Sequence, residues 1–506
     1  MRVFVTGGTG VVGRAAVEAL LAHGHTIRLF SRHAERDRAE LPEGVEARDG
    51  SVDQPERVRG SMDGMDAVLH IAGIVDESPP EVTFEKVNVQ GTRNLVEEAE
   101  RSGVRRFIYV SSLGADRGES DYHRSKRAAE EIVRGFRGEW LVLRPGNVYG
   151  PGDEVISLLL KMVRTLPAVP VIGDGDQRFQ PVCADDLGEA IARVVERREL
   201  AERVLLLAGA ELTSMNEILD IFAQLTDKRP PRLPLPGWLA STGLRVASAF
   251  GMDTPVNVDQ ITMLTEGNLI APGETNALTE VLGVEPTPLR EGLRRLADEL
   301  PEQLPADGVG TLVRRHYWAD IHDCPLDADA LWRRFVSRFA EIVPEGTVEV
   351  GAEPGTPTRL AEGETLTLGL PLRGNVQVRV AEVTDRGATM VTVAGHPLSG
   401  TVRFGVEPRD GALRFEVTTY DRPSNLVDYL AISTVGRVLK KSTWRSVVEN
   451  VVRESGGDAP GGVHDQSTAL DDEAAERAEE WAEALVMRLR RDEAEAAVEE
   501  KAEGKR

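Results

Sequence analysis

Residues 1–13, Met-Arg-Val-Phe-Val-Thr-Gly-Gly-Thr-Gly-Val-Val-Gly, decide the fold of the first half of this chain. Residues 3–5 predict a short buried strand, and glycines follow at every third position from Gly7 to Gly13. Residues 14–21 then predict a helix. A glycine turn between a strand and a helix lets the backbone approach a pyrophosphate, and the helix start offers free N–H groups. This segment therefore predicts a dinucleotide-binding unit, and the chemistry must come from later residues.

The length and composition of the chain limit the classes of protein that it can belong to. It has 506 residues, of which 41% are hydrophobic and 28% charged, as in soluble proteins of two or three domains. A net charge of −23 disfavours nucleic acids and anionic membrane surfaces as partners. Cys183 and Cys324 are the only cysteines, so neither a disulfide framework nor a metal site is expected.

The location follows from the absence of targeting signals in the sequence. No apolar run is long enough to predict a transmembrane segment. The first expected strand begins at residue 2, so we expect no signal peptide, a cytoplasmic protein and a small-molecule substrate.

The first half of the chain alternates strands and helices, which is typical of a parallel sheet covered on both faces. The expected strands are 2–6, 26–30, 45–48, 66–71, 106–111, 140–144 and 203–207. The expected helices are 13–23, 53–61, 84–102 and 122–135, and Ser214 with Glu217 predicts a capping box for another. We expect an α/β Rossmann-type doubly wound domain over residues 1–305, with a small substrate-binding subdomain.

The second half has a different texture. Residues 329–339 predict an amphipathic helix, and alternating strands follow, with hairpin turns at 385–387 and 409–411. A long helix is expected over 424–453, carrying Leu426, Tyr429, Leu430 and Val438. We therefore expect an α+β domain over 308–455. The charged tail, 456–506, predicts a solvated helix after a flexible linker, or partial disorder.

Candidate catalytic residues lie in Tyr122-His123-Arg124-Ser125-Lys126. On a helix, tyrosine and lysine four residues apart share one face. A lysine ammonium beside a phenol favours the phenolate and lowers its pKa, so Tyr122 would exchange a proton near neutral pH. The motif follows Ser111-Ser112 at the expected C-terminal end of a strand, where doubly wound sheets bind ligands. We take Ser112, Tyr122 and Lys126 as the catalytic candidates; taken alone, the tyrosine–lysine spacing would indicate only a surface pair.

These residues, together with the glycine turn, resemble the short-chain dehydrogenase/reductase superfamily in its extended or atypical, NAD-dependent epimerase/dehydratase-like branch. The resemblance covers residues 1 to about 300 and implies hydride transfer at a nicotinamide. It implies that Ser112 binds the substrate oxygen, Tyr122 carries the proton, and Lys126 tunes Tyr122 and holds the nicotinamide ribose. The short interval between Ser112 and Tyr122 looks more like the atypical branch, which includes the dinucleotide-binding accessory subunit of respiratory complex I.

Other segments resemble cofactor-lining turns of the same family, namely 70–73, 87–92 and 143–152. The residues that the resemblance assigns to cofactor binding are Thr6, Gly7, Gly10, Val11, Val12, Gly13, Ser31, Arg32, Ser51, Val52, Ala72, Gly73, Asn88, Lys126, Pro145, Asn147 and Val148. Arg178, after Gly173-Asp174-Gly175, resembles a residue with which sugar-nucleotide epimerases and dehydratases bind the substrate diphosphate, so it is the substrate candidate.

The choice of dinucleotide depends on the end of the second strand. The acid that the family usually carries there is replaced by Ser31-Arg32, and an arginine can pair with a 2′-phosphate. NADP is therefore expected, with NAD as the alternative and a solvated surface arginine as the competing interpretation. The adenine contact after the third strand is left open: Ser51 makes it, Asp49 makes it, or it is missing.

The second domain resembles the helix-grip fold of START-like (SRPBCC) proteins, on the strand 395–404 and the order of its elements. A sheet curved around a long helix suits a lipid- or quinone-like ligand, and a filled core is the alternative. The whole chain thus predicts an NAD(P)-dependent oxidoreductase or epimerase-like enzyme with a hydrophobic substrate. A homodimer is one oligomeric state that we consider. The alternatives are a nucleotide-sugar epimerase or dehydratase, and a redox-inert NADP(H)-binding assembly or sensor protein.

Overall fold

The computed structural model describes residues 1–236, 268–344, 348–371, 374–425, 428 and 437–503, with the side chains of 437–442 excepted. The sequence also predicts a helix near residues 235–250, with Trp238, Leu239, Leu244, Val246 and Phe250, and all of it beyond Pro236 lies outside the described residues. The same holds for the side chains of Leu426, Tyr429, Leu430 and Val438, named above for a ligand cavity.

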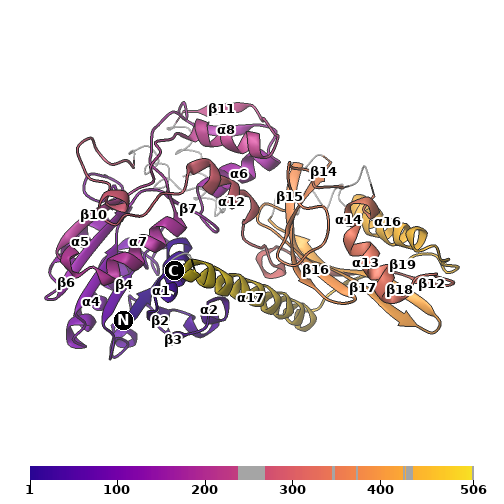
Figure 1. Cartoon of the computed structure of the whole chain (residues 1–506), viewed down its shortest axis with the longest axis horizontal. Helices are drawn as coiled ribbons and strands as arrows, with labels where there is room; N and C mark the ends of the chain where they lie inside the picture. The colour runs from indigo at the N-terminus through magenta and orange to yellow at the C-terminus, as the bar shows by residue number, and fades with distance from the viewer. Residues whose placement is uncertain (237–267, 345–347, 372–373, 426–427, 429–436, 504–506) are drawn as a thin grey trace.

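The N-terminal domain is built on a seven-stranded parallel sheet (Figure 1). Its strands are β1 (Arg2–Thr6), β2 (Thr26–Ser31), β3 (Val45–Asp49), β4 (Ala67–His70), β5 (Arg106–Val110), β6 (Glu139–Pro145) and β10 (Arg203–Leu207). The order is β10-β6-β5-β4-β1-β2-β3, and every expected strand is confirmed to within one residue at either end. The order reverses between β1 and β4, the point where ligands bind in such sheets.

Helices cover both faces of this sheet. One face packs against α1 (Val11–Ala22), α7 (Ala184–Glu196) and α11 (Ala277–Glu280). The other packs against α3 (Pro55–Val58), α4 (Gly91–Arg101, preceded by η2, Glu85–Gln90) and α5 (Asp121–Arg134). The helix expected over 53–61 is shorter than expected, because Arg59 is extended and Gly60 takes a positive φ of 77°.

A subdomain sits above the C-terminal edge of the sheet (Figure 1). Its elements are α6 (Ile156–Thr165), α8 (Met215–Leu225), α12 (Leu289–Asp298), and the paired strands β8 (Val169–Ile172) and β11 (Arg232–Leu235). The expected cap of α8 is confirmed, since the Ser214 hydroxyl accepts a hydrogen bond from Glu217 N at 3.3 Å. Short elements complete the domain: α2 (Ala34–Asp37), η1 (Arg38–Glu40), β7 (Val148–Tyr149), β9 (Val182–Cys183) and η3 (Arg198–Leu200). The next short helix, η4 (Pro305–Asp307), contacts β17 and β18 of the C-terminal sheet.

The C-terminal domain is a separate antiparallel sheet of eight strands, ordered β13-β14-β15-β16-β17-β18-β12-β19. The strands are β12 (Val313–Ile321), β13 (Glu349–Val350), β14 (Thr365–Leu370), β15 (Gly374–Val383), β16 (Gly387–Thr392), β17 (Leu398–Arg409), β18 (Ala412–Pro423) and β19 (His464–Ala469). The helices α13 (Ala328–Ser337), α14 (Phe339–Ile342) and α16 (Arg437–Ser455) pack on one face. Phe335 of α13 lies 5.0–5.6 Å, between ring centroids, from Phe339, Phe404 and Phe415, so aromatic rings fill this part of the core.

The chain then returns to the first domain through α17 (Asp472–Glu503), the yellow helix that ends beside α1 in Figure 1. The expected helix is present, but a solvated tail is wrong, because small and apolar residues recur on one face among the charges. The buried residues are Ala478, Ala482, Leu485, Val486, Leu489 and Ala494. Leu485, Val486 and Leu489 pack against Ala381 and Val391, on the sheet face opposite α13. No helix among the described residues is long and apolar enough to cross a membrane.

Candidate functional site

The glycine turn between β1 and α1 packs tightly against the chain's own backbone and leads directly into the start of a helix. Gly7 has a φ of +72°, and a Cβ there would lie 2.6 Å from Ala72 N, so only glycine fits. A Cβ on Gly13 would collide with the Gly7 carbonyl oxygen. Helix α1 begins at Val11 after an N-cap, Gly10, that makes no side-chain cap hydrogen bond. The first N–H groups of the helix are therefore available to an anion.

Thr6, at the end of β1, joins the glycine turn to the neighbouring strand β4. Its hydroxyl lies 2.8 Å from His70 Nδ1, and Ala72 N donates to it at 3.3 Å. His70 Nε2 lies 3.0 Å from the hydroxyl of Thr92 on α4. Burial, helped by Lys126, lowers the pKa of His70 to about 3, so the ring is neutral and holds the two strands together.

Most of the other residues expected at a cofactor lie at or after the C-terminal ends of parallel strands, whereas Asn88 lies in η2 and Lys126 in α5. Ser31 and Arg32 follow β2, Ser51 and Val52 follow β3, Ala72 and Gly73 follow β4, and Pro145, Asn147 and Val148 follow β6. Because parallel strands end at one edge of a sheet, the structure brings these segments to the edge where the glycine turn lies.

Two of these segments have further contacts. Ser31 donates to Asp37 at 2.5 Å, and Arg32 is exposed. Ser51 is hydrogen-bonded to Asp53. The side-chain oxygen Oδ1 of Asn147 is buried and has no hydrogen-bond partner in the structure, so it is an acceptor that remains available.

Gly73 packs closely against the side chains of both Asn88 and Lys126. A Cβ on Gly73 would lie 3.1 Å from Asn88 Oδ1 and 3.3 Å from Lys126 Nζ. Asn88 is held in place because its Nδ2 donates to Ile74 O at 3.1 Å and to Ser125 Oγ at 3.0 Å. Lys126 Nζ donates to Val110 O at 3.0 Å.

The three catalytic candidates lie together where β5 ends and α5 begins. Ser112 lies close enough to Tyr122 to lower its pKa, and Lys126 Nζ lies 5.9 Å from the centroid of the Tyr122 ring. Ser111 points elsewhere, donating to Glu130 at 2.6 Å, so Ser112 is the serine that faces the tyrosine. This arrangement can present a serine and a phenol to one substrate oxygen.

The pKa of Tyr122 differs from the sequence expectation. We expected Lys126 to lower it, but burial raises it to about 12, with the Ser112 hydrogen bond acting in the opposite direction. Burial also lowers the pKa of Lys126 to about 8, against the effect of Glu130. Burial disfavours the charged form of both groups, so it raises the pKa of the tyrosine and lowers that of the lysine.

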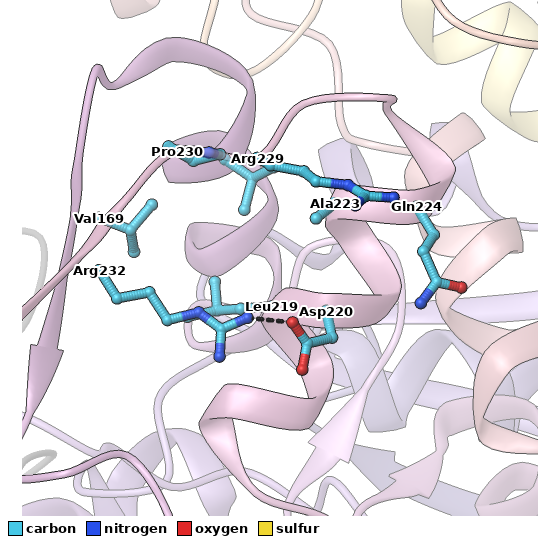
Figure 2. Close-up of a pocket in the computed structure, with 9 residues that line it drawn as sticks. Val169, Leu219, Asp220, Ala223, Gln224, Arg229, Pro230 and Arg232 are labelled. Carbon is cyan, nitrogen blue, oxygen red and sulfur yellow. Dashed lines mark hydrogen bonds and ion pairs between the residues drawn. The ribbon is translucent and has the colours of Figure 1, made fainter.

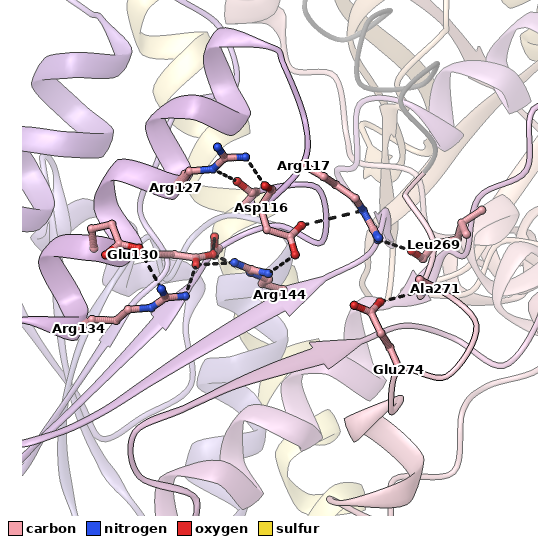
Figure 3. A network of polar contacts seen from close by, with 12 residues as sticks. Asp116, Arg117, Arg127, Glu130, Arg134, Arg144, Leu269, Ala271 and Glu274 are labelled. Atoms are coloured by element: carbon pink, nitrogen blue, oxygen red, sulfur yellow. Dashed lines mark hydrogen bonds and ion pairs between the residues drawn. The ribbon is translucent and has the colours of Figure 1, made fainter.

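A charged network holds the loop between Ser112 and Tyr122 (Figure 3). Glu130 on α5 is 1% exposed and accepts hydrogen bonds from Arg144 Nε at 2.8 Å and Nη2 at 2.7 Å. Arg144 Nη1 lies 2.7 Å from Asp116 Oδ2, in the loop itself. Arg117 donates to Leu269 O at 2.6 Å, which ties the loop to a segment after residue 267. The loop that follows Ser112 is therefore held in place by Arg144 and by the segment that contains Leu269.

Arg178 lies apart from this cluster, in the subdomain. It forms an ion pair with Glu217 of α8 at 2.7 Å, and the two side chains are 52% and 46% exposed. A cavity of about 190 Å³ lies in the same subdomain. Figure 2 shows the residues that line it, among which Arg232 pairs with Asp220. Its lining residues are Val163, Val169, Leu219, Asp220, Ala223, Gln224, Arg229, Pro230 and Arg232.

Sequence reasoning missed His123, which lies between two serines beside the candidate site. Its ring is fully buried, with Nε2 3.4 Å from Ser112 Oγ and Nδ1 3.0 Å from Ser120 Oγ. Its backbone N donates to Ser120 Oγ, the N-cap of α5. His123 was visible inside the Tyr-x-x-x-Lys motif, but no sequence spacing indicated that its ring supports Ser112.

Comparison with known proteins agrees with this geometry. Residues 3–207 match the NAD dependent epimerase/dehydratase family, and residues 335–449 match a domain of unknown function, DUF1990. Ceramide reductase of Caulobacter vibrioides is 30% identical over 256 residues, which is 50% of this chain and 80% of that protein. The chain therefore belongs to the NAD dependent epimerase/dehydratase family, and it joins this domain to a DUF1990 domain.

Other relatives cover the same half of the chain. Sterol demethylase protein B of Methylococcus capsulatus is 28% identical over 321 residues, 57% of this chain and 95% of that protein. The solved UDP-glucose 4-epimerase of Thermus thermophilus, in complex with NAD, is 24% identical, with a TM-score of 0.46, covering 59% of this chain and 98% of that one.

Proposed function

We propose that this chain is an NAD(P)-dependent oxidoreductase that interconverts a hydroxyl and a ketone on a hydrophobic, lipid-type substrate. The observation that carries the proposal is the placement of Ser112 close to Tyr122, which lies one helical turn from Lys126 at the C-terminal edge of the parallel sheet. A serine hydroxyl and a phenol that lie next to each other can both bind a single substrate oxygen atom, and the phenol can protonate it.

The residues around this edge fit a dinucleotide. Gly7 and Gly13 let the turn pack tightly against the backbone of Ala72 and against itself, and the start of α1 offers N–H groups to a pyrophosphate. Lys126 Nζ, beside Gly73, would hold the nicotinamide ribose, and the unpartnered Oδ1 of Asn147 would accept a hydrogen bond from the cofactor. The exposed Arg32 would pair with a 2′-phosphate, which favours NADP over NAD.

The dinucleotide, when bound, supplies or accepts the hydride at nicotinamide C4. In the reducing direction, the ketone carbon gains the hydride and its oxygen takes the proton of Tyr122, while Ser112 donates a hydrogen bond to that oxygen. In the oxidising direction, Tyr122 removes the hydroxyl proton. Lys126 tunes the tyrosine and holds the ribose, and His123 fixes the orientation of Ser112.

Relatives that are named for lipids support the substrate class. Besides the ceramide reductase and the sterol demethylase protein, the 3-beta-hydroxysteroid dehydrogenase of Mycolicibacterium neoaurum is 32% identical over 189 residues, covering half of that protein. A nucleotide-sugar epimerase is the second candidate, because the UDP-glucose 4-epimerase of Vibrio cholerae is 26% identical over 263 residues and Arg178 is available to a diphosphate.

The deciding experiment is calorimetric titration of the full chain with NADPH and NADH, followed by turnover assays. The substrate panel contains 3-hydroxysteroids, 3-ketosteroids, 3-ketosphingoid lipids and UDP-sugars. Redox change of the nicotinamide with a lipid ketone or alcohol supports the proposal. Conversion of a UDP-sugar without net redox change would instead support the epimerase. Tight nucleotide binding without turnover of any compound would support the redox-inert, nucleotide-sensing alternative.

A further inference from the structure

Helix α17 contacts two elements next to the segments that would hold the adenosine half of a dinucleotide. One is α1, which starts directly after the glycine turn, and the other is the α2–η1 segment, residues 34–40, which follows Arg32. Helix α17 packs on both α1 and η1. Figure 1 shows it running from the C-terminal sheet to the N-terminal domain.

Arg490, near the middle of α17, joins these parts of the molecule. Its Nη1 lies 3.1 Å from Glu40 Oε2 in η1, and its Nη2 lies 2.8 Å from Glu302 Oε2. Glu302 is almost fully buried and also binds Arg379 of β15 at 3.0 Å. One guanidinium therefore connects the N-terminal domain, the segment between the domains and the C-terminal sheet.

The contacts continue from Glu40 to the glycine turn. The carboxylate of Glu40 also pairs with Arg14, in the first turn of α1. Arg14 Nε donates at 3.1 Å to the carbonyl oxygen of Thr9, inside the turn. Although burial acts to raise it, the pKa of Glu40 is held below its usual value by Arg14 and Arg490, so this carboxylate stays ionised. An unbroken path of charged contacts thus runs from Arg490 to Thr9.

Two further ion pairs hold α17 against the same surface. Glu483 lies 2.6 Å from Arg36 of α2. Lys501 Nζ lies 2.7 Å from Glu18 of α1 and 3.0 Å from Asp185 of α7. Ion pairs therefore join α17 to α1, α2 and α7 of the N-terminal domain.

We propose that Arg490 is a positioning residue for dinucleotide binding, acting through Glu40 and Arg14 on the glycine turn. The inference rests on the proposed function, since it requires that this turn binds a dinucleotide. The C-terminal helix then contributes to nucleotide affinity without touching the nucleotide. Because coupling between two binding equilibria is reciprocal, a bound nucleotide also stabilises the docking of α17.

The test compares two arginines of α17 in the full chain. Arg490→Gln removes the contact with Glu40. Arg488→Gln is the matched control, since Arg488 pairs only at the half-exposed surface with Glu382 of β15, at 2.9 Å. Calorimetry with NADPH, NADH and ADP should show Arg490→Gln raising each Kd by about three- to tenfold, in the range of couplings carried by such networks. Arg490→Lys should recover part of the affinity, and the control should stay within about twofold of the parent.

A second variant keeps the test decisive if Arg490→Gln is unstable. Glu40→Gln breaks the same path while leaving Arg490 paired with Glu302, so it should also weaken all three nucleotides. If Arg490 acts through Glu40, the double variant should be no weaker than the weaker single variant. In the parent, NADPH should slow amide hydrogen exchange along residues 483–501, and Arg490→Gln should lose this protection.

The possible failures are distinct. Unchanged Kd values in folded Arg490→Gln and Glu40→Gln would overturn the inference and leave the proposed function intact. A parent chain that binds neither NADPH nor NADH would overturn both. Loss of NADPH affinity alone, with NADH unchanged, would also overturn it, because it would indicate an effect on the 2′-phosphate contact of Arg32 and not on the glycine turn.

Discussion

Arg164 of α6 and Glu353 of the C-terminal domain form a bidentate ion pair that is buried between the domains. Arg164 Nε lies 2.9 Å from Glu353 Oε1 and Nη2 lies 2.7 Å from Oε2, with both side chains under 5% exposed. Arg164 also donates to Gln377 Oε1 at 2.8 Å and to Ala297 O at 3.0 Å. A buried charge pair with its donors satisfied specifies one way for the domains to pack.

Breaking this pair should destabilise the protein strongly. Arg164→Gln leaves the Glu353 carboxylate buried without its cation, and the expected loss is about 3–5 kcal/mol. Thermal and urea unfolding should show a lower midpoint. Arg164→Met combined with Glu353→Leu should lose less than the single variant, because no charge remains buried. The control is Arg178→Gln, which breaks an exposed pair worth at most about 1 kcal/mol; an equal loss in the control would contradict the argument.

The C-terminal domain should need residues beyond 455 for its full stability. Strand β19 pairs antiparallel with β12, from Val313 with Ala469 to Trp318 with His464. A fragment of residues 308–471 should therefore unfold at a higher temperature than 308–455, as followed by circular dichroism. Coincident melting of the two fragments would show that β19 adds nothing to the sheet.

Much of the first domain could be predicted because its signals are local. Each strand is a short apolar run bounded by turn residues, and each expected cofactor segment follows a strand, so parallel topology alone assembles them at one edge. The pairing of Ser112 with Tyr122 followed from the same rule together with helical spacing. The roles assigned to these residues remain predictions.

The relationships that were missed depend on contacts distant in sequence. Arg164 and Glu353 are 189 residues apart, and no pattern in either segment indicates the other. The apolar residues of α17 are interrupted by many glutamates and arginines, which makes the apolar face hard to recognise. Even a clear apolar face would not show which surface it packs against. The expected direction of the Tyr122 pKa shift was wrong, because the shift depends on burial, which only tertiary packing creates.

Arg32→Ala should remove the preference for NADP. The arginine is exposed after β2, and a charge-assisted contact with a 2′-phosphate is worth roughly 1–3 kcal/mol, or about one to two decades in Kd. NADPH affinity should fall by that factor, while NADH affinity should change little. Arg38→Ala is the control, because Arg38 lies in η1 of the same connection and pairs with Glu35 at the surface. Tighter binding of NADH by the parent would contradict the assignment.

Tyr122→Phe should lower kcat by about two decades or more, the scale of proton transfer by a positioned group. The ring and its packing against Phe84 remain, so the fold and the nucleotide Kd should be preserved. Single-turnover kinetics with a substrate found in the panel would measure the effect. A fully active variant would remove Tyr122 from the mechanism and favour the non-catalytic alternative.

Lys126→Met should stabilise the nucleotide-free protein at neutral pH, because a buried ammonium is removed. The pKa of Lys126 is lowered to about 8 by burial, against an ordinary value near 10.4, so the unfolded chain binds more protons between these two values. The stability of the parent relative to the variant should therefore be lowest below pH 8 and should recover as pH rises toward 10. The difference at pH 7 should be at most about 3 kcal/mol, reduced by the lost hydrogen bond to Val110 O. Urea unfolding of both proteins from pH 6 to pH 10 measures the gap. A difference in unfolding free energy that stays constant with pH would show that burial does not lower the pKa of Lys126. It would also show that placing this lysine near the reacting groups does not cost the protein stability.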